Sequence, residues 1–406
     1  MTIKELAYSA QQHLHTRTGS SFKRAHIYEL LAALFGFNSY AALSAEAVFT
    51  RRRQFSKYSS KHNSAIKQRC VELGYQPATA DVASSELTSF VAERQIEVVR
   101  LSDLVAELRG ESSFLEGDEG DQLDDGLEEM FARTWPDPRD EEFSPILMDG
   151  LEAAASKGFE LAHYALALIH APNEYDGHQE VGSSYWYSQA QQGRVLTGVE
   201  KEWAEAHEAR LTQAEKYTRH LREAVRLGNQ HALLDLAESF DDPSFFEQPR
   251  RDVDADPAAV AAIAERMGRA ADAKHWLTVA AESGDTDAIL QLIEKHDQGD
   301  LLRCWTWVYL SKLVGTDLTE DAHYAINEDG SEYDDDVGGP VYVAGRDSIV
   351  LEPLSAEQDA TARLAALDMF EKIQRTGEVR QLAQHLDEGH CHPDVLSGSQ
   401  CSNPTA

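Results

Sequence analysis

The feature that most constrains the fold is a turn pattern that recurs in the second half of the chain. Each copy has an alanine four residues before a glycine and another alanine four residues after it. The copies are Ala154–Gly158–Ala162, Ala224–Gly228–Ala232 and Ala280–Gly284–Ala288. Glycine supplies the left-handed residue that ends a helix, and small alanines let two helices approach closely. With Asn229 and Asp285 as caps of the following helices, the pattern predicts pairs of antiparallel helices.

Aromatic residues share this spacing, since each stands eight residues before a glycine. These pairs are Tyr185–Gly193, Trp276–Gly284 and Trp307–Gly315. The aromatics are expected to fill the space between neighbouring helix pairs. The long interval between Gly228 and Gly284 predicts an insertion at Asp241–Asp256. One helix pair cannot bury both of its faces, whereas a stack can. The predicted fold class is therefore all-α, with a degenerate α-solenoid over residues 143–318.

The clearest copy, Trp276, Ala280-Ala281-Glu282-Ser283-Gly284-Asp285 and Ala288, resembles the Sel1-like repeat. That family is related to the tetratricopeptide repeat and has the same helix-turn-helix architecture. The copies at Gly158 and Gly228 match less fully, and threonine replaces the second alanine at Thr197 and Thr319. The resemblance implies a scaffold that acts as an adaptor between proteins. It assigns Gly158, Ala162, Gly228, Ala232, Trp276, Gly284, Ala288, Trp307 and Gly315 to structural roles.

The first 75 residues are predicted to form a basic helical module. Helices are expected at 3–16 and 22–35, with a short one from about Ser39 to Leu43. The stretch Lys23–Leu43 resembles the small N-terminal helical module of some bacterial proteins labelled glyoxalase-related. No metal-binding glyoxalase fold follows it, so that enzymatic label is not carried over.

Charge divides the chain sharply. The first 70 residues hold 11 Lys and Arg against 3 Glu, which gives them a net charge of +8. Since the whole chain has a net charge of −33, the remaining residues carry −41. Arg51, Arg52, Arg53 and Lys57 are interleaved with Phe55 and Tyr58. Cations that meet phosphates beside stacking aromatics are typical of nucleic-acid contact. A solvated basic helix that docks on the acidic body of this protein explains the same residues.

The remaining segments are predicted from composition and periodicity. Residues 76–110 read as connecting helices, and residues 111–142 as an acidic flexible linker in which Leu123 and Ala132 exclude an EF-hand. Residues 319–355 are expected to form an acidic loop and a β-hairpin near 341–351, with strands at Val341–Ala344 and Gly345–Leu351. Capping helices are predicted over residues 356–388, and a disordered tail over residues 389–406.

Searches for catalytic motifs find none, so no catalytic, cofactor-binding or metal-ligating residue is predicted. Asp334–Asp336 can be interpreted as part of a solvated loop or, more specifically, as a site for a cation or a basic peptide. The four scattered cysteines favour a reducing compartment. We expect no signal peptide, and the longest apolar run, Leu30–Phe37, is too short to span a membrane. A cytoplasmic location without a membrane partner is expected.

Three functions are consistent with these residues. The first is a non-enzymatic adaptor that binds a protein partner with a basic surface, because an acidic groove steers such partners. The second is a nucleic-acid-associated regulator that uses residues 1–75. The third is an enzyme with an unrecognised site, for which Asp334–Asp336 would be the first suspect.

Overall fold

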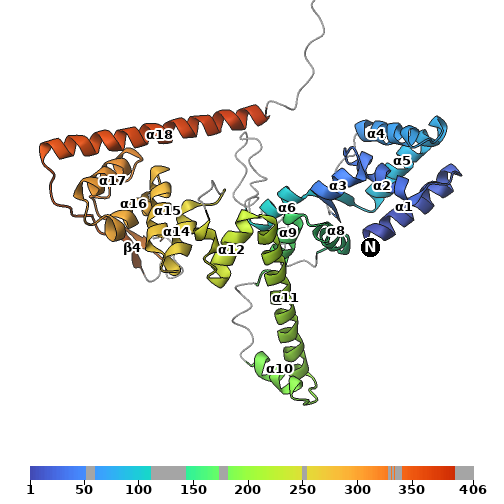
Figure 1. Ribbon diagram of the computed structural model, residues 1–406, viewed down its shortest axis with the longest axis horizontal. Coiled ribbons are helices and arrows are strands. Elements are labelled where there is room, and N and C mark those ends of the chain that lie inside the picture. The colour runs from blue at the N-terminus through green and yellow to red at the C-terminus, as the bar shows by residue number, and fades with distance from the viewer. Residues whose placement is uncertain are drawn as a thin grey trace, which may run out of the picture. The chain divides into compact units, whose positions relative to one another are not determined.

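The computed structural model describes residues 1–51, 60–110, 143–172, 182–248, 254–327, 331, 333 and 341–388. These residues are mostly helical, with two small two-stranded sheets. The prediction of a mainly helical fold is therefore confirmed, and the α-solenoid over residues 143–318 stays a prediction. The chain divides into two compact units, Met1–Glu247 and Gln248–Ala406, whose elements are labelled in Figure 1.

The first unit contains a long run of helices and one strand pair. In chain order its elements are α1 (Ile3–Thr18), α2 (Arg24–Leu34), α3 (Tyr40–Glu46), β1 (Ala47–Arg51), α4 (Ser60–Glu72), α5 (Pro77–Glu93), β2 (Ile96–Arg100), α6 (Leu101–Leu108), α8 (Pro145–Ala155), α9 (Glu160–Ile169), α10 (Ser183–Gln191), α11 (Val199–Leu227), α12 (Gln230–Phe240) and α13 (Ser244–Glu247).

The second unit is also helical and carries the other strand pair. Its elements are α14 (Pro257–Arg266), α15 (Ala270–Glu282), α16 (Thr286–Gln291), the π-helix η2 (Leu292–His296), α17 (Leu301–Leu313), β3 (Ala322–Ile326), β4 (Tyr342–Arg346) and α18 (Ala356–Glu388).

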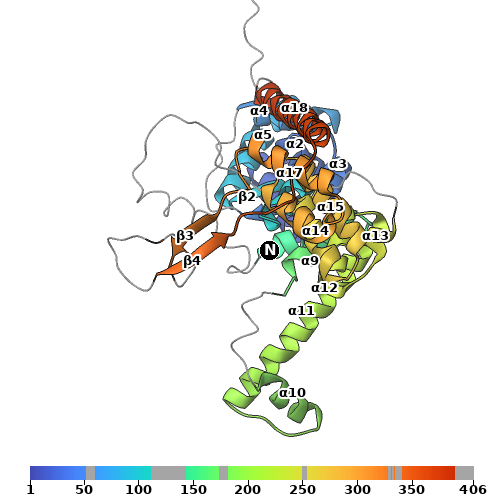
Figure 2. The ribbon, with the colours of Figure 1, turned by 90° about the vertical axis from the view of Figure 1, so that its left-hand side faces the viewer.

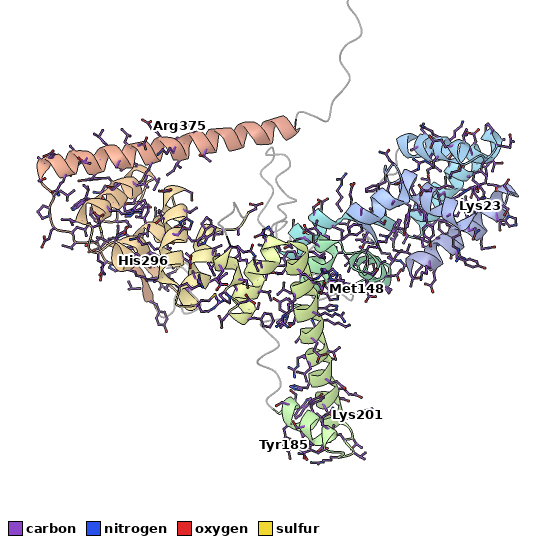
Figure 3. The ribbon with its side chains drawn as sticks, viewed as in Figure 1. Lys23, Met148, Tyr185, Lys201, His296 and Arg375 are labelled. Carbon is purple, nitrogen blue, oxygen red and sulfur yellow. The ribbon has the colours of Figure 1, made fainter. Side chains whose placement is uncertain are left out.

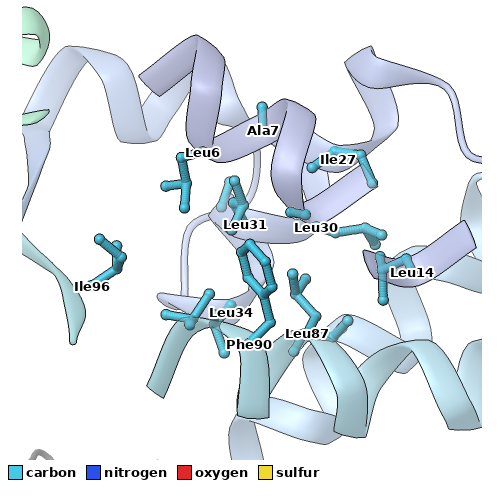
Figure 4. Close-up of a cluster of buried hydrophobic side chains, with 14 of the residues drawn as sticks. Leu6, Ala7, Leu14, Ile27, Leu30, Leu31, Leu34, Leu87, Phe90 and Ile96 are labelled. Carbon is cyan, nitrogen blue, oxygen red and sulfur yellow. The ribbon is translucent and has the colours of Figure 1, made fainter. Parts of the chain in front are cut away.

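The N-terminal helices share one apolar core (Figure 4). A capping box begins α1: the Thr2 hydroxyl accepts a hydrogen bond from the Glu5 N–H, and the Glu5 carboxylate accepts one from the Thr2 N–H. Leu14 of α1 and Phe90 of α5 lie in the same cluster of buried side chains. Helices on both sides of residue 75 therefore contribute to a single core.

Residues 76–110 are not all helical, which corrects the prediction of connecting helices there. Ile96–Arg100 forms β2, which pairs antiparallel with β1 and sets Val99 opposite Val48. The β-branched residues Val98 and Val99 suit a strand, and their pairing partner lies about fifty residues earlier in the chain. Periodicity within the segment gave no sign of that partner.

The hairpin near residues 341–351 exists, but its strands are not the two that were predicted. β4 pairs with β3, about twenty residues earlier, rather than with residues 345–351. Gly345 has φ of +113°, and a Cβ there would lie 1.8 Å from the Ala322 carbonyl oxygen. After Arg346 the chain leaves the sheet, and the Ile349 N–H bonds the Leu318 carbonyl instead.

The recurrent turns join helix pairs as expected. Gly158 lies between α8 and α9, Gly228 between α11 and α12, and Gly284 between α15 and α16, with φ of +84°, +105° and +100°. The alanines that follow them are fully buried: Ala162, Ala232 and Ala288. Asn229 and Asp285 accept hydrogen bonds from Ala232 N and Ala288 N, which confirms both caps.

The predicted aromatic positions divide into two groups. Trp276 and Trp307 are buried, whereas the side chain of Tyr185 is 54% exposed and fills no core. Gly315, with φ of +110°, ends α17, but β3 rather than a second helix is the next element. The turn pattern therefore continues at Gly315 without completing a helix pair.

A single helix covers the range predicted for several capping helices. α18 runs without a break from Ala356 to Glu388, and Gly377 lies inside it, where one glycine disfavours a helix by only about 1 kcal/mol. Ala362 and Ala366 are buried, and α18 packs against α17. The Tyr309 hydroxyl of α17 donates a hydrogen bond to Asp359.

Replacing Gly284 by valine is expected to lower the free energy of unfolding by about 1–3 kcal/mol, because a β-branched residue is strained at φ of +100°. Chemical denaturation followed by circular dichroism measures the loss. Gly299→Val is the matched control, since Gly299 lacks a left-handed φ and a Cβ there meets no atom within 4 Å. Equal stability of the two variants would contradict the expectation.

Candidate functional site

Among the described residues of the first unit, the most exposed apolar side chains lie on a helical arm, which we define as residues Ser183–Lys216. It comprises α10, the connection Gln192–Gly198 and the first half of α11. Figure 1 shows α10 beside the far end of α11, and Figure 3 labels Tyr185 and Lys201 in the same place. The second half of α11 is rooted in the unit by buried residues that include Tyr217 and Leu221.

The arm receives little cover from the rest of its unit. From Val199 to Lys216, all of them described, only Ala204 is buried. The contacts between α10 and α11 include a hydrogen bond of 2.7 Å from the Arg210 guanidinium to the Ser183 hydroxyl and a ring contact between Tyr187 and His207 at 5.1 Å. The arm is therefore a two-helix hairpin with a defined internal packing.

Large apolar side chains are concentrated on this hairpin and remain open to solvent. The exposed fractions rise from 39% to 88% in the set Trp203, Leu211, Tyr185, Val199 and Val195. Trp186 is less exposed and lies beneath the Arg194 guanidinium, 4.8 Å from the ring centre. Tryptophan, tyrosine and arginine dominate the centres of protein interfaces. An apolar group of this size on a projecting element is typical of a partner-binding surface.

Two shallow clefts run along α11. One, of about 480 Å³, is lined by His170, Glu205, Glu208, Ala209, Thr212, Gln213 and Lys216. The other, of about 380 Å³, is lined by Pro172, Ser183, Ser184, His207, Arg210, Leu211, Gln213 and Ala214. The first lining is mainly polar and the second is mixed, with Leu211 and Ala214 beside Arg210 and His207, and both clefts open to solvent, so they suit peripheral contacts rather than an enclosed small molecule.

Charges on the arm nearly cancel. Five Glu residues face four Lys and Arg between Ser183 and Lys216, and surface ion pairs such as Arg194–Glu200 and Lys201–Glu205 join opposite signs at 3.5 and 3.4 Å. Pairs of this kind contribute little to stability. The recognition capacity of the arm therefore lies in its aromatic and aliphatic side chains rather than in net charge.

A hydrogen-bonded histidine relay lies at the root of the arm. The Nδ1 atoms of His163 and His220 are 3.0 Å apart, His163 Nε2 lies 3.0 Å from the Ala155 carbonyl oxygen, and Arg219 bonds His220 Nε2 at 3.0 Å. Because Arg219 only donates, His220 Nε2 accepts, so His220 Nδ1–H donates to His163 Nδ1. Both rings are then neutral.

Burial favours the same neutral state. Desolvation, with the positive charge of Arg219 second, lowers the pKa of His220 to about 4. Burial also lowers the pKa of His163 and of His170, the latter with help from Lys216. Among the residues that the structure describes, no three His, Cys, Asp or Glu side chains are placed to hold a metal ion. The relay is therefore read as a structural network.

The second unit contains a buried carboxylate, Asp297, that follows the π-helix. Its oxygens lie 2.6 Å from Lys274 Nζ and 3.0 Å from Arg303 Nε, and they accept a hydrogen bond of 2.9 Å from Trp307 Nε1. Burial opposes its ionisation, but the hydrogen bonds from Lys274 and Trp307 outweigh this effect and hold the pKa of Asp297 low. Each oxygen has a partner, which favours an anchoring role over catalysis.

Of the four predicted nucleic-acid contacts, the structure describes one. Arg51 is exposed at the end of β1, whereas Arg52, Arg53 and Lys57 lie outside the described residues. Other cations of the N-terminal module are engaged internally: Arg17 with Glu86, Lys67 with Asp81 and Arg69 with Glu29. Nucleic-acid binding by residues 1–75 stays a prediction.

Several other predicted segments fall outside the description. The acidic linker 111–142, Asp334–Asp336 and the tail 389–406 are not described. The arm, by contrast, was missed because Tyr185 was assigned to a core. One sequence signal could have indicated the arm. After Gly193, Thr197 replaces the second alanine of the turn pattern, so the close helix crossing is not encoded there. The apolar Val195 lies in a loop and Val199 at the start of α11.

No family model matches the chain, and no curated protein or solved structure matches it. The Sel1-like resemblance therefore rests on the turn residues alone. A search of the described helices for a membrane-spanning segment finds none.

Proposed function

We propose that this chain is a non-enzymatic interaction protein that binds a protein partner through the apolar end of its arm. The observation that supports this most strongly is the exposure of Tyr185, Val199 and Trp203 on one projecting hairpin. Burial of such side chains releases roughly 25 cal/mol per Å² of apolar surface, which makes them the favoured centre of an interface.

The partner is expected to present an apolar groove with few charges. The arm offers aromatic anchors and nearly balanced charge, so shape and apolar contact would determine recognition. Helix-in-groove binding uses side chains spaced three or four residues apart, and Val199 and Trp203 have that spacing. The helix pairs joined at Gly158, Gly228 and Gly284 would serve as Sel1-like scaffold units in this adaptor.

The arm triple variant Tyr185→Ser, Val199→Ser, Trp203→Ser is expected to lose its partner. Affinity capture from the native host should recover at least tenfold less of each protein that is specific to the wild-type chain, since one interface anchor contributes about 2 kcal/mol or more. The dissociation constant of the recovered partner, purified, should rise by the same factor.

The matched control is Tyr8→Ser, Val71→Ser, Val82→Ser. These side chains are also large, apolar and exposed on helices of the first unit, so this variant should capture the partner as the wild type does. Both variants should melt at the wild-type temperature. Equal recovery by the arm variant would overturn the proposal.

A further inference from the structure

A second group of exposed apolar side chains lies on the β3–β4 ribbon of the other unit. Figure 2 shows these strands side by side, extending away from the helices of their unit. The base of the ribbon is fixed by Arg346, whose guanidinium donates hydrogen bonds to the carbonyl oxygens of Asp317, Leu318 and Glu320 at 2.8–3.2 Å. The ribbon is therefore held firmly at one end.

Both faces of the ribbon are open in the part of the chain that the structure describes. The register places Tyr342 opposite Ile326 and Ala344 opposite Tyr324, so these four share one face. Tyr324 is 61% exposed, Tyr342 45%, and Val343 on the other face 73%. Neither face contributes to a core, although its residue types suit a packed sheet.

The two edges of the ribbon differ. The Tyr333 N–H bonds the Ala325 carbonyl oxygen at 3.4 Å, so this carbonyl points away from β4. Ala325 and its partner Val343 therefore form a non-hydrogen-bonded pair, and the N–H and C=O of Val343 point outward from β4. No backbone bond from another described residue reaches Val343. β4 thus presents an edge at which a further strand can pair.

The charge of the sequence that carries the ribbon favours some added strands over others. Between Leu313 and Gly345 the sequence has nine Asp and Glu and no Lys or Arg, and three of the nine, Asp317, Glu320 and Asp321, belong to the described residues. Asp321 directly precedes β3 and Asp347 directly follows β4, so both lie at the same end of the ribbon. Asp321 accepts a hydrogen bond from the Ser348 N–H. A strand rich in Lys or Arg complements this charge, and its cations can also lie over the faces of Tyr324 and Tyr342.

We propose that the β3–β4 ribbon binds an extended basic segment of a partner protein, which adds a third strand along β4. Main-chain hydrogen bonds to Val343 give affinity, and alternate side chains of the added strand contact Tyr324 and Tyr342. This surface belongs to a different unit from the arm, so it extends the proposed function to a second kind of ligand.

The probe is a fluorescein-labelled decapeptide of alternating lysine and valine, titrated into the full chain at low salt and followed by fluorescence anisotropy. Saturable binding is expected, with affinity that falls as salt is added. Two peptides serve as controls. Alternating glutamate and valine should not bind, and the lysine peptide with N-methylated valines should bind at least tenfold more weakly because its strand hydrogen bonds are blocked.

Variants locate the site. Tyr324→Ser with Tyr342→Ser should weaken peptide binding at least tenfold, and so should Val343→Pro, which removes the outward N–H. Val343→Thr keeps a strand-forming residue and should bind as the wild type does. The arm triple variant should also bind normally, so failure here and failure of the arm proposal are separate results.

Three outcomes would overturn the inference. The first is absence of binding at low salt. The second is equal binding of the N-methylated peptide, which would indicate attraction by charge alone. The third is concentration-dependent dimerisation of the wild-type chain that Val343→Pro abolishes, which would assign the β4 edge to a second copy of this chain. Analytical ultracentrifugation measures that dimerisation.

Discussion

Replacing Trp307 by alanine is expected to lower the free energy of unfolding by about 4 kcal/mol. The side chain is fully buried in α17, and truncation of a buried aromatic leaves a cavity that its neighbours fill only in part. The substitution also removes the indole N–H that donates to Asp297 at 2.9 Å, so a buried carboxylate loses one of its partners. Denaturant unfolding followed by circular dichroism at 222 nm measures the change.

Two further variants separate these contributions. Trp307→Phe keeps most of the apolar volume but cannot donate to Asp297, and is expected to cost about 1–2 kcal/mol. Trp305→Ala, two residues away, should cost less than Trp307→Ala, because Trp305 is only partly buried and its N–H bonds the Glu352 carbonyl. Similar losses of unfolding free energy for Trp305→Ala and Trp307→Ala would contradict the difference in burial between the two side chains.

Acidification from pH 7.5 to pH 5 is expected to reduce stability by about 2 kcal/mol through His220 alone. Its pKa in the folded chain is about 4, below the ordinary value of about 6.5. The unfolded chain therefore binds more protons between these values. The stabilisation is complete above about pH 6.5 and is lost as pH falls toward 4. His163 and His170 act in the same direction, since burial also lowers each pKa.

The groups around the relay have both signs. Arg219, Lys216 and Arg226 of α11 oppose protonation, whereas Glu223 on the same helix favours that of His163. His220→Leu removes one titrating group and should flatten the dependence of unfolding free energy on pH between 6.5 and 4.5. An unaltered slope in His220→Leu would contradict the assignment.

The turns were predictable because their chemistry is local. Gly284 and Asp285 are adjacent, and the left-handed glycine and the capping carboxylate both act within a few residues. The same holds for Ala288, whose small size serves a helix crossing wherever the partner helix lies. Local rules sufficed for the helix pairs because each pair is contiguous in sequence.

The strands and the networks depend on residues that are distant in sequence. β2 was read as helix because Val98 and Val99 show their strand role only when paired with β1. The ion pair and hydrogen bond of Asp297 depend on Lys274 and Trp307, which come from two different helices, so no local pattern marks this aspartate. Tyr185 has the spacing of a core aromatic, but no described helix of its unit covers its exposed side chain.

The continuity of α11 has a consequence for linkage between two properties of the chain. One unbroken helix holds Trp203 near its start and His220 near its end, about 26 Å apart at 1.5 Å per residue. Consider a partner that binds the Trp203 half of α11 more tightly when His163 and His220 are neutral. By thermodynamic reciprocity, its binding would lower the proton affinity of these histidines by the same factor. For such a partner, the loss of affinity on acidification and the lowered histidine pKa of the bound chain would report the same coupling free energy. Either the partner's affinity at two pH values or the histidine titration with and without the partner would measure it.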